Sequence, residues 1–111
     1  MSGYVWNPEP YRDAIAALCR QYHVQELAVF GSALGPTFGP ASDIDLLVSF
    51  EPQAKIGLFA FFRLQRELSS LLQRKVDLVP REGLKPLIRD EVLAQARVLY
   101  APSRPATARY S

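Results

Sequence analysis

Three short apolar segments, each too short to be a typical helix, most constrain how this chain can fold. They are residues 26–30, 43–50 and 75–79. Glycine or proline stands within two residues of the end of each segment. Short apolar runs bounded by such turn residues are typical of buried strands. The sequence therefore predicts a small β-sheet built from at least these three strands.

Apolar residues at helical spacing predict helices between and around the strands. The expected helices cover residues 9–22, 57–73 and 84–96, and residues 97–100 are a candidate last strand. This order predicts an α+β (mixed α/β) fold in which helices pack on a small mixed sheet. A chain of 111 residues has room for one domain, which we place at residues 1–100. The small, polar, proline-containing residues 101–111 are expected to form a flexible C-terminal tail.

The charge distribution argues against several classes of partner. The formal net charge is +2, and Arg104 and Arg109 supply all of it, so residues 1–100 are neutral. Because no basic block or stripe is present, we expect no direct nucleic-acid binding. The N-terminus lacks the basic and apolar regions of a signal peptide, and no apolar run is long enough to span a membrane. The expected location is the cytoplasm.

One cysteine and one histidine limit the metal chemistry that the chain can support. Cys19 excludes an internal disulfide and any multi-cysteine zinc site, and its position predicts a core residue. His23 alone cannot build a site that needs several imidazoles. Any metal must therefore be held by oxygen ligands, which favours Mg²⁺, Mn²⁺ or Ca²⁺.

Three aspartates occupy positions where a charge is costly. Asp43 and Asp45 lie two residues apart on one expected strand, so both project from the same face. Asp77 interrupts the apolar segment 75–79. Partly buried, unpaired carboxylates cost several kcal/mol, so three of them close together favour a bound cation. If the strands are neighbours, the carboxylates converge, and a pair of Mg²⁺ ions would neutralise them and bind a reacting phosphate.

Simpler interpretations of these aspartates stay open. Asp43 and Asp45 also fit a solvated strand start, and Asp77 also fits the exposed face of an alternating strand. A calcium-binding loop does not fit, because the acidic, glycine and glutamate positions that it requires do not follow.

Gly31 and Ser32 follow the first strand and open a loop over residues 31–42. A glycine lets the backbone turn tightly and lets a phosphate approach its N–H groups. The Ser32 hydroxyl can add a hydrogen-bond donor, although it can also simply cap a helical turn. A glycine-serine phosphate cradle facing carboxylates is what nucleotidyl transfer from a metal-bound triphosphate requires.

This constellation resembles the DNA-polymerase-beta-like nucleotidyltransferase superfamily. Gly31-Ser32, ten residues, then Asp43-Ile44-Asp45 matches its Gly-Ser-x10-Asp-x-Asp signature, and its third acidic residue falls on Asp77. The order of the surrounding segments is most similar to the minimal nucleotidyltransferase (MNT) group. The resemblance covers about residues 10–100 and implies a palm-like fold, with Asp43, Asp45 and Asp77 as metal and catalytic residues and Gly31 and Ser32 as nucleotide-binding residues.

The resemblance also implies a substrate and a partner. Many MNT proteins are antitoxins of HEPN-domain ribonuclease toxins, and members of that branch transfer AMP from ATP to a toxin tyrosine. It therefore implies a Mg²⁺-dependent protein adenylyltransferase, with Mn²⁺ as a possible substitute, that forms a hetero-oligomer with a HEPN toxin.

Two positions depart from the pattern of the family. Gly35 stands where relatives often carry an arginine, and Ala41 where they are often acidic. A non-catalytic antitoxin that occludes its toxin, and a nucleotide sensor that binds ATP without turnover, are therefore the alternatives.

Phe59, Phe61 and Phe62 fall within four residues of one expected helix. They cannot all point inward, so at least one is expected to face a groove or a partner. Arg63, Arg66, Arg74 and Lys75 are candidates for contact with a triphosphate, although a solvated helix face is the simpler interpretation.

Overall fold

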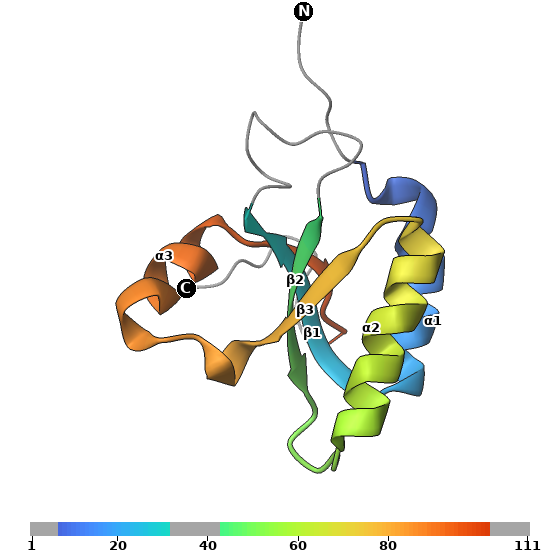
Figure 1. The fold of residues 1–111 in the computed structure, drawn as a ribbon, viewed down its shortest axis with the longest axis horizontal. Coiled ribbons are helices and arrows are strands. Elements are labelled where there is room, and N and C mark those ends of the chain that lie inside the picture. The colour runs from blue at the N-terminus through green and yellow to red at the C-terminus, as the bar shows by residue number, and fades with distance from the viewer. Residues whose placement is uncertain (1–6, 32–42, 103–111) are drawn as a thin grey trace, which may run out of the picture.

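The computed structural model describes residues 7–31 and 43–102, which form a four-stranded mixed sheet with helices against it. The strand order is β3-β2-β1-β4. Helices α1 and α2 lie side by side against one face of the sheet, and α3 lies on the other side (Figure 1). The predicted mixed α+β fold is confirmed.

The elements follow one another with short connections. They are η1 (Glu9–Tyr11), α1 (Arg12–Gln21), β1 (Val24–Phe30), β2 (Ile44–Phe50), α2 (Leu58–Leu72), β3 (Val76–Pro80), η3 (Arg81–Gly83), α3 (Pro86–Gln95) and β4 (Arg97–Tyr100). Each predicted helix and strand is present with small differences at its ends, and η3 is an addition. Within the described ranges, no helix is long and apolar enough to cross a membrane.

The first helix and strand differ slightly from prediction. The expected helix 9–22 is divided, with a 3-10 turn at Glu9–Tyr11 before α1. Strand β1 begins at Val24 rather than residue 26. The reason is His23, whose φ of 59° is in the left-handed region. That single residue turns the chain from the end of α1 directly into the strand, so no longer loop is needed.

The sheet combines antiparallel and parallel pairing. Strand β1 pairs antiparallel with both β2 and β4, whereas β2 pairs parallel with β3. The parallel pair is possible because α2 returns the chain to the end of the sheet at which β2 began. Two parallel strands joined through a helix therefore form the half of the sheet that carries Asp45 and Asp77.

The main core lies between the sheet and helices α1 and α2. Alternate residues of the strands point into it, among them Leu27, Val29, Ile44 and Leu46. Cys19 of α1 belongs to this core, as predicted, and is completely buried. Burial raises the pKa of the Cys19 thiol to about 12, and the nearby charge of Arg20 opposes this change.

A hydrogen bond joins α1 to α2 at the edge of this core. The Tyr22 hydroxyl donates to Glu67 Oε2. Burial raises the pKa of Tyr22, and the hydrogen bond and the negative charge of Glu67 raise it further. The side chain is buried, so the polar group of Tyr22 finds its partner on the neighbouring helix.

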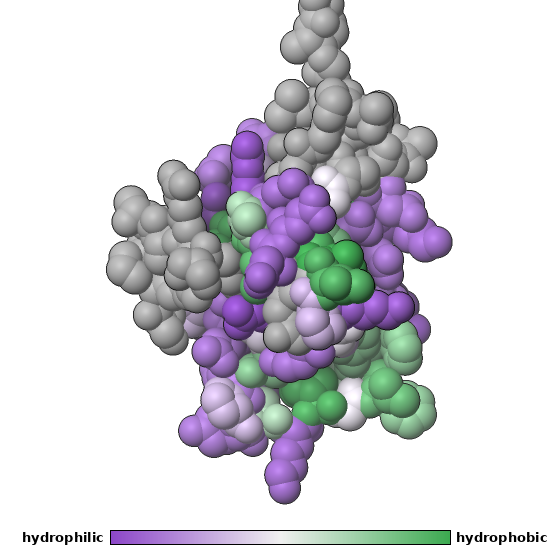
Figure 2. All heavy atoms as spheres, turned by 90° about the vertical axis from the view of Figure 1, so that its left-hand side faces the viewer, coloured by the Kyte–Doolittle hydropathy of each residue, from purple (hydrophilic) through white to green (hydrophobic). Residues whose placement is uncertain are grey.

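Helix α3 contributes little to the core. Its Leu87 side chain is 95% exposed and its Ile88 side chain 45% exposed, whereas Leu84, just before the helix, is buried. The second face of the sheet is nevertheless covered at its centre, where Ala28 and Leu47 are completely buried, whereas Asp77 on the outer strand is exposed. Figure 2 shows the molecule from the α3 side, with hydrophilic side chains over much of the surface and apolar side chains between them.

Candidate functional site

Asp45 and Asp77 lie next to each other on adjacent strands. Each is the second residue of its strand, and the parallel register places their Cα atoms opposite one another. Neighbouring strands are about 4.8 Å apart. Because the residues on either side of each aspartate are buried in the core beneath α1 and α2, both carboxylates project from the opposite face. Asp45 is half-buried and Asp77 is exposed.

A backbone hydrogen bond aligns the beginnings of the two strands. The N–H of Ile44 donates to the carbonyl oxygen of Lys75 at 2.9 Å. It fixes the register from the first residue of β2, one position before Asp45. Asp43 precedes the strand and is exposed. The site therefore begins where the ladder between β2 and β3 begins.

Gly31 lies directly against the Asp45 carboxylate. Its neighbour Phe30 pairs with Asp45 in the antiparallel register of β1 and β2. Gly31 has a φ of +75°, and an ideal Cβ there would overlap Asp45 Oδ2 and lie 3.2 Å from Asp45 Cγ. Both the backbone conformation and the space therefore require glycine. A polypeptide backbone thus comes close to a carboxylate at the end of β1.

The donor set at the start of β2 and β3 fits a divalent cation in its chemistry. The paired Asp45 and Asp77 carboxylates supply only oxygen, the ligand type that Mg²⁺ and Mn²⁺ prefer. Within residues 7–31 and 43–102, however, no group of three or more His, Cys, Asp or Glu side chains is arranged to hold a metal ion. Asp43 stands outside the ladder that aligns the other two. The convergence of all three stays a prediction.

The structure describes only part of the predicted phosphate cradle. Ser32, Gly35 and Ala41 lie outside the described residues. Of the two residues proposed for nucleotide binding, Gly31 alone can be placed, at the end of β1, beyond Phe30.

The arginines of α2 lie on the wrong side of the sheet for a role at this site. Arg63 and Arg66 are exposed on α2, which covers the face opposite to Asp45 and Asp77 (Figure 1). The simpler interpretation, a solvated helix face, is therefore confirmed for these two. Lys75 is exposed just before β3, and its backbone carbonyl accepts the hydrogen bond from Ile44 that aligns β2 with β3.

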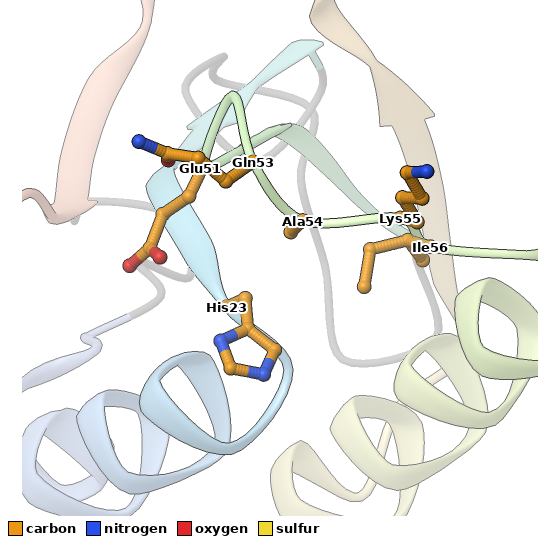
Figure 3. A pocket seen from close by; sticks show the side chains of 6 residues that line it. All are labelled: His23, Glu51, Gln53, Ala54, Lys55 and Ile56. Carbon is orange, nitrogen blue, oxygen red and sulfur yellow. The ribbon is translucent and has the colours of Figure 1, made fainter.

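A separate hollow lies at the other end of β2. It has a volume of about 610 Å³ and is lined by His23, Glu51, Gln53, Ala54, Lys55 and Ile56 (Figure 3). The N–H of Glu51 donates to the carbonyl oxygen of His23 at 2.9 Å and closes the sheet there. Asp45 and Glu51 are six positions apart, which is about 20 Å along an extended strand. This hollow is therefore no part of the carboxylate site.

Two polar residues that the sequence analysis did not single out lie behind the carboxylate strands. Gln65 and Ser69 of α2 accept hydrogen bonds from backbone N–H groups of β3. Their only signal in the sequence is a pair of uncharged polar residues, four positions apart, each directly following a leucine of the predicted helix.

Comparison with known proteins identifies the fold and its chemistry. The sequence profile of the nucleotidyltransferase domain matches residues 12–99, which include every described strand except the last residue of β4. The chain belongs to the nucleotidyltransferase domain family. It is thus a nucleotidyltransferase, and Asp45, Asp77 and Gly31 lie within the matched region.

This nucleotidyltransferase is similar to proteins of related description. The protein adenylyltransferase MntA of Thermococcus cleftensis is 37% identical over 78 residues, which are 70% of this chain and 77% of that protein. A solved structure described as a candidate minimal nucleotidyltransferase is 36% identical, with a TM-score of 0.68, over 80% of this chain and 89% of the other. A toxin-antitoxin structure with AMP-PNP is 27% identical, with a TM-score of 0.65, over 81% and 73%.

Proposed function

We propose that this nucleotidyltransferase is an antitoxin that transfers AMP from ATP to a tyrosine hydroxyl of a HEPN ribonuclease toxin and so neutralises it. The observation that carries the proposal is the register of Asp45 with Asp77 beside the backbone of Gly31. That arrangement places two carboxylates beside a backbone position that carries no side chain. The relative named MntA is a protein adenylyltransferase, and another similar structure is a toxin-antitoxin complex with an ATP analogue.

Each residue of the site has a role in this proposal. Asp45 and Asp77 would hold a divalent cation, with Asp43 as a further ligand. When bound, Mg²⁺ would offset the charge of the triphosphate and favour attack at its α-phosphorus. Gly31 would let the phosphates approach the backbone, and Ser32 would donate a hydrogen bond to them.

The reaction is a displacement at the α-phosphorus of ATP. The tyrosine oxygen forms the new bond to phosphorus, and the bond from phosphorus to the oxygen that bridges to the β-phosphate breaks. Pyrophosphate leaves, and the toxin keeps AMP on its tyrosine. We assign the acceptance of the hydroxyl proton to Asp77, because its exposed carboxylate can reach an incoming protein side chain.

The surface carries apolar side chains suited to contact with a protein. Among residues 7–31 and 43–102, the exposed large apolar residues are Leu58, Phe59, Phe62, Leu87 and Ile88. Those near the start of α2 belong to the lower end of the molecule in Figure 1, where apolar side chains also gather in Figure 2. Exposed apolar groups of this kind support a protein partner.

Transfer of labelled AMP tests the proposed activity. The chain is mixed with ATP labelled at the α-phosphate, Mg²⁺ and its cognate HEPN protein. We expect label on the HEPN protein, with loss of at least about a hundredfold in rate for Asp45→Asn and Asp77→Asn. Asp13→Asn, at an exposed position in the first turn of α1, is the matched control and should keep full activity.

The same variants decide between modification and occlusion. If the doubly substituted Asp45→Asn/Asp77→Asn chain is folded, transfers no label and still silences the ribonuclease, the antitoxin acts by binding alone. Loss of both label transfer and neutralisation supports the proposed mechanism.

A further inference from the structure

Helix α2 reaches around the outer edge of the sheet and contacts the backbone of β3. The N–H of Val76 donates to Ser69 Oγ at 3.0 Å, and the N–H of Leu78 donates to Gln65 Oε1 at 2.9 Å. Strand β3 is the outermost strand beside β2. In such a strand alternate N–H groups point away from the sheet, where they otherwise need water or another strand.

The Ser69 hydroxyl makes two hydrogen bonds that fix its orientation. It donates to the carbonyl oxygen of Gln65 at 3.0 Å and accepts from Val76. Because its own proton is used within the helix, its lone pairs face the strand. The side chains of Gln65 and Ser69 lie one turn apart on the same side of α2, and each accepts one backbone N–H of β3.

These two hydrogen bonds flank Asp77. They hold the residues immediately before and after it, while Asp77 itself pairs with Asp45 in the register of β2 and β3. Around Asp77, strand β3 is thus hydrogen-bonded to β2 on one edge and to α2 on the other. A strand of only five residues depends strongly on such contacts.

We propose that Gln65 and Ser69 are positioning residues, which keep the Asp77 carboxylate beside that of Asp45 by holding β3 in register. They belong to α2, which covers the face of the sheet opposite to the carboxylates (Figure 1), so they would not touch a nucleotide or metal bound at Asp45 and Asp77. The inference rests on the proposed role of Asp77 in binding a divalent cation. It assigns a function in the site to a helix whose other buried residues only form core.

Substitutions at Ser69 test the proposal with close controls. Ser69→Ala removes the acceptor, Ser69→Thr keeps it, and Ser70→Ala makes the same change at the exposed neighbouring position. Gln65→Met removes the second acceptor while keeping the length of the side chain. Tyr22→Phe removes a side-chain hydrogen bond between α1 and α2 that does not involve β3.

The first readout is amide hydrogen exchange, which needs no activity. In Ser69→Ala we expect exchange at Val76 to accelerate about fivefold to tenfold, the effect of losing one hydrogen bond. Exchange there should stay unchanged in Ser69→Thr and Ser70→Ala. Unchanged exchange in Ser69→Ala and in Gln65→Met would show that α2 does not hold the strand.

The second readout is binding of Mn²⁺, measured by its electron paramagnetic resonance signal with AMP-PNP present. We expect several-fold weaker binding for Ser69→Ala and Gln65→Met, and wild-type binding for Ser69→Thr and Tyr22→Phe. Equal Mn²⁺ affinity in all variants, despite faster exchange, would overturn the positioning role. This measurement needs no toxin, so its outcome is separate from failure of AMP transfer.

Discussion

At the scale of single residues, Gly31 is the least tolerant of a side chain among the three glycines that the structure describes. Gly31→Ala places a Cβ at a left-handed φ and against the Asp45 carboxylate. We expect the free energy of unfolding to fall by about 1–2 kcal/mol from the backbone alone. Nucleotidyl transfer should fall more steeply, because Asp45 must also move.

The control for this prediction is Gly83→Ala. Gly83 has no positive φ, and a Cβ there would meet only Pro80 Cβ at 4.0 Å. Urea denaturation and the rate of AMP transfer are measured for both variants. Equal effects of the two substitutions would contradict the assignment of Gly31 to the site.

The Cys19 thiol predicts a loss of stability at alkaline pH. Its pKa is raised from 9.0 to about 12 in the folded protein, so the thiolate forms first in the unfolded chain. The contribution of Cys19 to stability is therefore complete below pH 9.0 and decreases as the pH rises toward 12. Cys19→Val should remove this part of the pH dependence, measured by urea denaturation at about pH 8 and about pH 10.

Tyr22 acts in the same direction, because its pKa is also raised. The comparison of wild type with Cys19→Val at each pH isolates the thiol, since Tyr22 is present in both. A pH dependence that is identical in the two proteins would show that ionisation of Cys19 is not involved.

Some features of the site follow from the sequence of single residues, whereas others depend on how the strands pair. The spacing of Asp43, Asp45 and Asp77 indicated oxygen-ligand chemistry, because a carboxylate in an apolar strand is costly unless a cation or another partner stabilises it. The contact of Gly31 with Asp45 was beyond the sequence, since it depends on the antiparallel register of β1 and β2. No local pattern encodes that register.

At the scale of elements, α2 is the helix on which the core depends most. Leu68 is completely buried and packs between α2 and the sheet. Leu68→Ala should lower the free energy of unfolding by about 2–5 kcal/mol, through lost burial and the cavity that remains. Arg66→Ala on the exposed face of the same helix should change it by less than about 0.5 kcal/mol.

Chemical denaturation monitored by circular dichroism checks both variants. A small domain has only about 5–15 kcal/mol of stability, so Leu68→Ala should unfold at a clearly lower denaturant concentration than the wild type. A fully folded Leu68→Ala chain with wild-type stability would mean that α2 is not anchored by this residue.

The elements themselves were well predicted where periodicity was strong. The helix expected at 57–73 is α2, at Leu58–Leu72, because its apolar positions repeat at helical spacing. The start of β1 was placed two residues late, because the left-handed turn at His23 replaces a loop. Periodicity alone did not reveal that α3 leaves Leu87 exposed, since exposure depends on how the helix sits against the sheet.

At the scale of the whole molecule, the exposed phenylalanines concern partners rather than stability. Phe59 is 91% exposed, whereas Phe61 packs edge-on against Phe50 with a centroid distance of 6.4 Å. The expectation that the three phenylalanines cannot all point inward is confirmed. Phe59→Ser should change the free energy of unfolding by less than about 0.5 kcal/mol.

Under the proposed function, the same substitution should weaken binding of the HEPN partner several-fold, measured by calorimetry with the purified proteins. Gln53→Ser, at an exposed position between β2 and α2, is the control. Unchanged affinity in Phe59→Ser would place the partner on another surface, such as the exposed side of α3.

The order of the elements was sufficient to predict the fold class of the whole molecule. Short apolar runs alternating with amphipathic segments indicate helices on a mixed sheet. The strand order β3-β2-β1-β4 was not predicted, because β4 joins β1 from the far end of the chain. Pairing over so long a separation depends on the assembled core rather than on neighbouring residues.

The two hydrogen bonds from β3 to α2 have a consequence for the order in which the chain folds. Ser69 and Val76 are separated by 7 positions in sequence, and Gln65 and Leu78 by 13. Closing such short loops costs little entropy, whereas the pairing of Leu27 with Tyr100 must close most of the chain. Helix α2 and β3 are therefore suited to form an early nucleus, with β4 adding late. The part of the protein that holds Asp77 in place would then be among the first to assemble.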